Sequence, residues 1–149
     1  MPIPNLLPDV ELIVRDHLVG FAEVAAIVGT DAAGEVRVFT RLPDPPPAGP
    51  FVRLRRLPSP PVRARPLWLD AAAVQLDCYG GGQRQANRLA ETVRAALDQL
   101  ADGAVTEGVA TGVDQGAMGY LPDPDLLTER GGARERYIVD VTVYTHPER

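Results

Sequence analysis

The amino-acid sequence predicts an α+β protein in which two helices pack on one face of a mostly antiparallel sheet. Two segments place apolar side chains at the three-and-four spacing of an amphipathic helix. Several shorter segments alternate apolar and polar residues, as strands do when one face is buried. Along the chain the order is helix, two or three strands, helix, two strands, and this order fits a largely antiparallel sheet covered by helices.

The two predicted helices span residues 9–28 and 84–100. Asp9 stands where an N-cap or first-turn acid belongs, and Gly29 ends the first helix. The second helix has a polar face rich in arginine and acidic residues. Its apolar face, which we expect to pack on the sheet, is formed by Ala86, Leu89, Ala90, Val93, Leu97 and Leu100.

Alternating patterns predict strands at residues 35–42, 51–57, 74–79 and 136–146, the last being the clearest. Residues 104–118 hold valines among regularly spaced glycines. Glycine inside a strand often marks a bulge or a sharp bend. We therefore expect a kinked or bulged strand in this last segment.

The 149 residues suffice for one well-filled core, and the sequence shows no internal repeat, so we expect a single domain over residues 1–149. Prolines predict a stiff loop at residues 43–50. Prolines, glycines and charges predict an acidic loop at residues 121–135. No apolar run approaches the roughly 20 residues of a membrane span, so we expect no membrane partner.

The composition excludes several kinds of enzyme. All 15 basic residues are arginine, so a phosphate-loop lysine and a Schiff-base lysine are impossible. Ser59 is the sole serine and lies between prolines, which leaves no nucleophile elbow. Cys78 is the sole cysteine, so it cannot form an internal disulfide. We expect no catalytic residue and no cofactor.

Two features could still carry chemistry, and each has a plainer interpretation. Gly80 to Gly82 precede a helix and could cradle phosphate, but Gln85 occupies the third glycine position of the dinucleotide motif, which favours a simple turn. Cys78 could be a nucleophile with His17 or His146 as its base. Its phase in the strand favours a small buried hydrophobe.

Asp123 and Asp125 could offer oxygen ligands to a hard cation. The ordered spacing and the terminal glutamate of a calcium loop are missing, however. We interpret the pair as a solvated Pro-Asp turn and expect no metal site.

One dense basic patch remains, formed by Arg53, Arg55, Arg56, Arg63 and Arg65. Guanidinium groups on a strand face can pair with carboxylate or phosphate, or they can form a solvated outer face. The net charge of −5 and the few aromatic residues speak against strong nucleic-acid binding. The patch is therefore our candidate for a subunit or partner interface, with Asp123 and Asp125 as an acidic complement.

Five segments, in this order, carry a resemblance to a known family that spans nearly the whole chain. The sequence resembles the tail terminator, or tail completion, proteins of long-tailed bacteriophages, particularly phages of actinobacterial hosts. The segments are PDVELIVRDHL, PFVRLRRL, VQLDCYGGGQRQANRLAETVRAAL, GVATGVDQGAMGYLPDPD and RERYIVDVTVYTH.

The resemblance implies a structural virion protein that assembles into a ring, usually a hexamer, at the head-proximal end of the tail. Such a ring caps the tail tube, stops its polymerisation and joins the tail to the head connector, while DNA only passes through the lumen. Assembly would take place in the host cytoplasm. The alternatives are a head-to-tail connector or tail tube subunit, a small nucleic-acid-binding module using the arginines, and a cysteine-dependent hydrolase.

Overall fold

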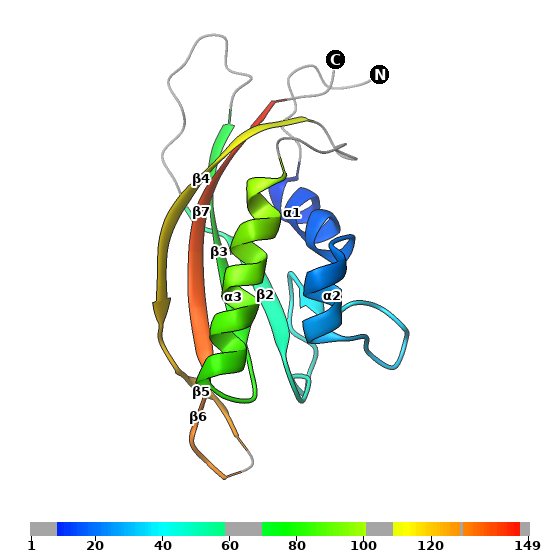
Figure 1. Ribbon diagram of the computed structural model, residues 1–149, viewed down its shortest axis with the longest axis vertical. Coiled ribbons are helices and arrows are strands. Elements are labelled where there is room, and N and C mark those ends of the chain that lie inside the picture. Colours follow the sequence, from blue (N-terminus) through cyan, green and yellow to red (C-terminus); the bar gives the residue numbers. More distant parts are fainter. Residues whose placement is uncertain (1–8, 59–69, 101–108, 129, 147–149) are drawn as a thin grey trace.

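The computed structural model describes residues 9–58, 70–100, 109–128 and 130–146. At its centre is a five-stranded sheet in the order β1-β2-β3-β7-β4 (Figure 1), and a small second sheet pairs β5 with β6. β1 runs parallel to β2, whereas β2–β3, β3–β7 and β7–β4 are antiparallel. The strands of the large sheet are Val38–Phe39 (β1), Phe51–Arg56 (β2), Asp70–Tyr79 (β3), Val109–Tyr120 (β4) and Arg136–His146 (β7).

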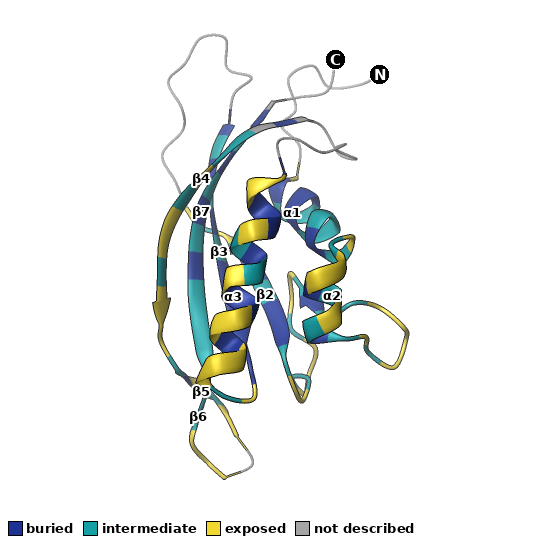
Figure 2. Ribbon diagram, viewed as in Figure 1, coloured by how far each residue is buried: buried dark blue, intermediate teal, exposed yellow. Residues whose placement is uncertain are grey.

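The helices of the described chain cover one face of this sheet (Figure 1), and the predicted α+β class is confirmed. The helices are Val10–Val19 (α1), Ala22–Val28 (α2) and Gln83–Asp98 (α3). α3 contacts β3, β4 and β7 and turns its apolar side toward them, while its outward side is exposed (Figure 2). Each leucine or valine buried in this way contributes roughly 1.5–3 kcal/mol to stability.

The first predicted helix is divided into two, which corrects the prediction of one helix over residues 9–28. The Gly20 amide donates to the Asp16 carbonyl and the Phe21 amide donates to the Leu18 carbonyl, which ends α1, and Phe21 adopts an extended conformation before α2 begins. Glycine is a poor helix former, so the break falls there. The apolar spacing continues through the break because α1 and α2 bury their apolar sides in the same core.

The predicted strands are present in the described chain, with differences in their bounds. The segment at residues 35–42 forms strand structure only at Val38–Phe39, because Val36 pairs with Thr30 in a local turn instead. β3 begins earlier than predicted, at Asp70. β7 has the predicted bounds. For the strand predicted at residues 104–118, residues 104–108 lie outside the described residues, and β4 continues to Tyr120. β4 has the predicted irregularity, with register shifts after Ala110 and after Gln115.

The predicted acidic loop contains a hairpin, which corrects its assignment as a loop. Asp123–Leu127 (β5) pairs with Ala133–Arg134 (β6), and Gly131, at φ 83°, lets the turn close with a hydrogen bond from its amide to the Thr128 carbonyl. The hairpin extends beyond the large sheet, at the bottom of the view in Figure 1.

Candidate interaction surface

The sheet face opposite the helices carries Arg53 and Arg55, as the alternation predicted. Val52 and Leu54 enter the core between the helices and the sheet, so the two arginines point the other way. In register with them on β3 are Asp77 for Arg53 and Gln75 for Arg55. The outer face therefore brings the predicted cations beside polar groups of the neighbouring strand.

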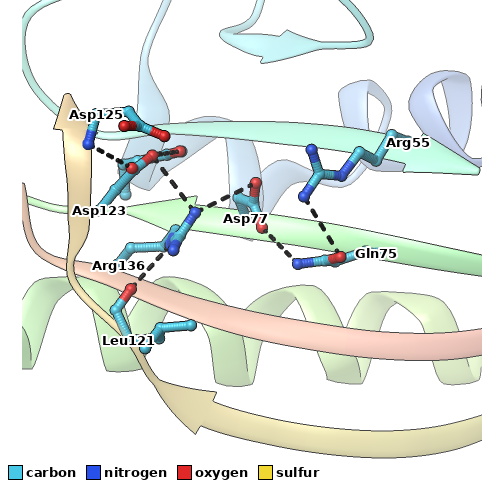
Figure 3. A network of polar contacts seen from close by, with 8 residues as sticks. Arg55, Gln75, Asp77, Leu121, Asp123, Asp125 and Arg136 are labelled. Atoms are coloured by element: carbon cyan, nitrogen blue, oxygen red, sulfur yellow. Dashed lines mark hydrogen bonds and ion pairs between the residues drawn. The ribbon is translucent and has the colours of Figure 1, made fainter. Parts of the chain in front are cut away.

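A chain of polar contacts runs across this face from β2 to the hairpin (Figure 3). Arg55 Nη2 donates to Gln75 Oε1 at 3.5 Å, and Gln75 Nε2 donates to Asp77 Oδ1 at 3.3 Å. Arg136 Nη1 lies 3.8 Å from Asp77 Oδ2 and 3.4 Å from Asp123 Oδ2. Arg136 thus connects two carboxylates, one on the sheet and one on the hairpin.

Asp123 is a buried network member, so our interpretation of this residue as part of a solvated turn is wrong. Only 5% of the residue is exposed. The Tyr79 hydroxyl donates to its Oδ2 at 2.6 Å, and the Asp125 amide donates to its Oδ1 at 3.0 Å. Sequence analysis missed this role because Tyr79 and Arg136 come from distant parts of the chain.

The charge state of the network follows from these contacts. Burial alone would raise the pKa of Asp123, but the hydrogen bonds from Tyr79 and Asp125 and the Arg136 charge together lower that pKa below its ordinary value. Burial raises the pKa of Asp77 despite the opposing charge of Arg136. Burial and the bond to Asp123 raise the pKa of Tyr79, so its hydroxyl stays a donor at neutral pH.

Arg136 also fastens the approach to the hairpin. Its Nε donates to the Leu121 carbonyl at 2.8 Å (Figure 3), and the Leu121 amide donates to the Arg136 carbonyl. Because the Arg136, Asp77 and Asp123 side chains are all nearly buried, removing one partner would leave the others with uncompensated charge. The network therefore holds the base of the hairpin against the outer face of the sheet.

Two aromatic rings close the same corner. Phe51 stacks on Tyr79 with ring centroids 4.4 Å apart, and the Arg134 guanidinium lies 5.7 Å from the Phe51 centroid. Strand alternation placed Phe51 and Tyr79 on the outer face, yet both are buried. Strand alternation could not predict that these two rings are covered, because the residues that cover them belong to β6 and its neighbours, in another part of the sequence.

The other candidate residues are separated from this network or lie outside it. Arg56 forms an ion pair with Asp70, with 2.8 Å between Nη1 and Oδ2, at the far end of β2. The Asp125 side chain is exposed on the hairpin. Arg63 and Arg65 lie outside the described residues.

The glycine turn between β3 and α3 is structural. A Cβ on Gly80 would lie 2.5 Å from the Ala86 amide nitrogen, so only glycine allows this approach of helix and turn. The Gly81 amide donates to Gln85 Oε1 at 2.7 Å. Gln85, which stands in place of the third glycine of the dinucleotide motif, therefore accepts a hydrogen bond from one of the amides that a phosphate would need.

Cys78 is buried in the core, where burial and the nearby Asp77 charge raise the pKa of its thiol. The proposed base His17 places Nε2 2.6 Å from the Ala96 carbonyl oxygen, and the His146 side chain lies outside the described set. Among residues the structure describes, no cluster of three or more histidine, cysteine, aspartate or glutamate side chains could hold a metal ion. No helix there is long and apolar enough to cross a membrane.

The helix layer, the sheet and the hairpin form a two-layer α+β fold with a polar outer face. The same fold occurs in a solved chain described as "Virion of native gene transfer agent (GTA) particle", at 19% identity and a TM-score of 0.63. The likeness covers 91% of this chain and 93% of that one.

A family model described as tail completion protein gp17 matches residues 13–146, and the chain belongs to this family. It is therefore a structural protein of the phage tail. Comparison with curated proteins gave no match.

Proposed function

We propose that the protein forms a ring, of six copies, that caps the head-proximal end of the tail tube, stops tube growth and joins the tail to the head connector. Family membership over residues 13–146 is the observation that carries this proposal. The ring would assemble in the host cytoplasm, enter the virion and leave its lumen open for DNA.

The mechanism would be steric and complementary. Subunits that contact one another through two different surfaces form a closed ring when the rotation between them closes. One face of such a ring matches the end of the tube. The other face lacks the surface that adds a further tube ring, so growth stops without any chemical step.

The outer sheet face is our candidate for a subunit or tube contact. Arg53 is half-buried there, and within the described residues no hydrogen bond or ion pair holds its side chain. Arg55 Nη2 donates to Gln75 Oε1, and the Arg55 charge also acts on Asp77. Asp125 supplies an exposed acid on the hairpin, whereas Asp123 supports this surface from within the subunit. Complementary charges of this kind set register more than affinity.

Native mass spectrometry of the purified protein, with and without purified tail tube, tests the ring. We expect a closed complex of one defined mass, with or without the tube. A protein that stays monomeric at high concentration and ignores tube ends would contradict the proposal, and a protein that polymerises by itself would be a tube subunit instead.

A further inference from the structure

We propose that the β5–β6 hairpin of one subunit inserts into the groove between α2 and α3 of a second copy and so joins neighbouring subunits. The inference rests on the ring described above and names the surfaces that would build it. The two surfaces belong to the same chain, and each has an apolar centre and charges that suit the other.

The hairpin end of the molecule carries the exposed apolar side chains. Within the described residues, the large hydrophobic side chains that remain exposed are Leu127 (57%), Leu121 (54%) and Tyr120 (37%). They lie on the hairpin and on the segment that leads into it, and the ribbon of this projection is largely exposed (Figure 2). Exposed apolar side chains at one end of a molecule are a candidate interaction site when they lie together.

The hairpin is also held in a fixed position before any partner binds. Asp123 near its base is bound by Tyr79 and Arg136, and Arg136 also holds the Leu121 carbonyl. A preorganised element loses little conformational freedom on binding, so more of the contact energy appears as affinity. The base of the hairpin is therefore fixed against the sheet by side-chain contacts.

The groove lies on the helical face, between α2 and α3, and has a volume of about 500 Å³. Phe21 and Ile27 from the α2 side and Ala95 from α3 give it an apolar floor. Exposed Glu23 and Glu91 supply acidic groups at its rim. An apolar floor with a few placed charges is the usual make-up of a binding groove.

Two described charges of the hairpin have counterparts of opposite sign in the groove. The hairpin turn exposes Arg130, which suits Glu23 and Glu91, and Asp125 suits the groove's Arg88. None of these five side chains has an ion-pair partner elsewhere in the described parts of the subunit. Pairing opposite charges around an apolar centre would fix the orientation of the hairpin in the groove.

A second copy is the occupant that these features favour. The hairpin projects past one end of the sheet (Figure 1), whereas the groove is lined by residues of the helical layer. A contact between two different surfaces of identical chains is heterologous, and such contacts generate rings when they close. The inserted hairpin would thus provide the repeated joint of the ring.

Crosslinking between introduced cysteines tests the contact directly. Leu127→Cys combined with Ala95→Cys, treated with a short bismaleimide, should give a ladder of covalent oligomers that ends at the mass of the wild-type ring. Native Cys78 is buried and does not compete. The matched control combines Leu127→Cys with Ala117→Cys, because Ala117 is exposed on β4, away from the groove, and it should give no ladder.

A charge exchange provides a second, independent test by native mass spectrometry. Arg130→Glu should weaken ring assembly at least about tenfold, which is about 1.4 kcal/mol, and combining it with Glu91→Arg should restore assembly. Wild-type rings without a specific ladder and without charge rescue would overturn the hairpin contact but leave the ring. Hairpin variants that form normal rings but lose the tube would assign the hairpin to the tube. A wild-type protein that never forms rings would refute the ring, and this joint with it.

Discussion

Asp123 shows how one residue can look like surface in the sequence and act as a support in the structure. It lies between two prolines in an acidic segment, which is the composition of an exposed turn. In the folded chain its carboxylate instead accepts bonds from Tyr79 and Asp125 and pairs with Arg136. Tyr79 on β3 and Arg136 on β7 are distant from Asp123 in the sequence. The composition around Asp123 therefore could not predict that it is buried against them.

We predict that Asp123→Asn lowers the free energy of unfolding by about 1–3 kcal/mol at neutral pH, because Tyr79 and Arg136 lose a charged partner. The folded pKa of Asp123 is below its ordinary value of 3.8, so its stabilising effect is complete above that value and is lost as pH falls through the folded pKa. Urea unfolding of both proteins should therefore show a difference that shrinks below pH 3.8.

Asp125→Asn is the matched control, because the Asp125 side chain is exposed and its contribution to the network is a backbone amide. It should change the free energy of unfolding by less than about 0.5 kcal/mol. If the two variants were equally stable, or if the Asp123→Asn effect did not depend on pH, the carboxylate would not hold the hairpin. Asp77 has the opposite pH dependence. Burial raises the pKa of Asp77 in the folded state, so ionisation of this group lowers the free energy of unfolding as pH rises to neutral.

Residue positions within strands were well predicted, because alternation depends on local geometry alone. It placed Arg53 and Arg55 on the outer face and Cys78 in the core. What alternation could not predict was which outer residues are covered. Tyr79 and Phe51 are buried because other segments fold over them, and this is a tertiary event.

Among the elements, the turn between β3 and α3 depends on a close backbone approach. Gly80 is buried against the first turn of α3, where the Cβ of any other residue would lie 2.5 Å from the Ala86 nitrogen and 3.0 Å from its Cα. Backbone atoms cannot yield as a flexible side chain can. Glycine is therefore required at position 80 because a Cβ has no space there.

We predict that Gly80→Ala destabilises the protein by about 1–3 kcal/mol, the usual cost of overpacking. Gly82→Ala is the control, since a Cβ there would meet no atom within 4 Å and its φ of −160° suits any residue. Thermal and urea unfolding of the two variants measure the difference. Equal effects at both positions would show that the turn adjusts and that close packing at Gly80 is not required.

Elements were predictable where the pattern was long and regular, as in α3 and β7. The helical spacing over residues 9–28 could not reveal the break at Gly20, because α1 and α2 share one core and so one pattern. The hairpin could not be predicted either, because its short β6 strand gives no measurable alternation. Its position depends on Arg136 and Asp123 rather than on its own composition.

The protein carries different surfaces on its different sides. The outer sheet face presents Arg53 and Arg55 on β2 and acidic Asp140 on β7, in register with Gln75. The opposite side presents the helices and their groove. Distinct surfaces of this kind are what a heterologous ring and two unlike ring faces need.

We predict that Arg53→Gln weakens assembly, either of the ring or of the ring with the tube, by at least about tenfold, or about 1.4 kcal/mol. The neutral substitution avoids adding a carboxylate beside Asp77. Native mass spectrometry and tube binding at increasing salt provide the measurement, with urea unfolding to confirm the fold. Arg84→Gln, on the exposed side of α3, should leave assembly unchanged. Equal behaviour of the two variants would place the contact away from Arg53.

Tube growth in the presence of purified protein tests whether this protein ends the tail tube. Electron microscopy of growing tubes should show that adding the protein halts elongation and leaves one ring at one end of each tube. Tubes that keep growing at an unchanged rate, or protein that adds repeatedly to the tube as a further subunit, would contradict the claim.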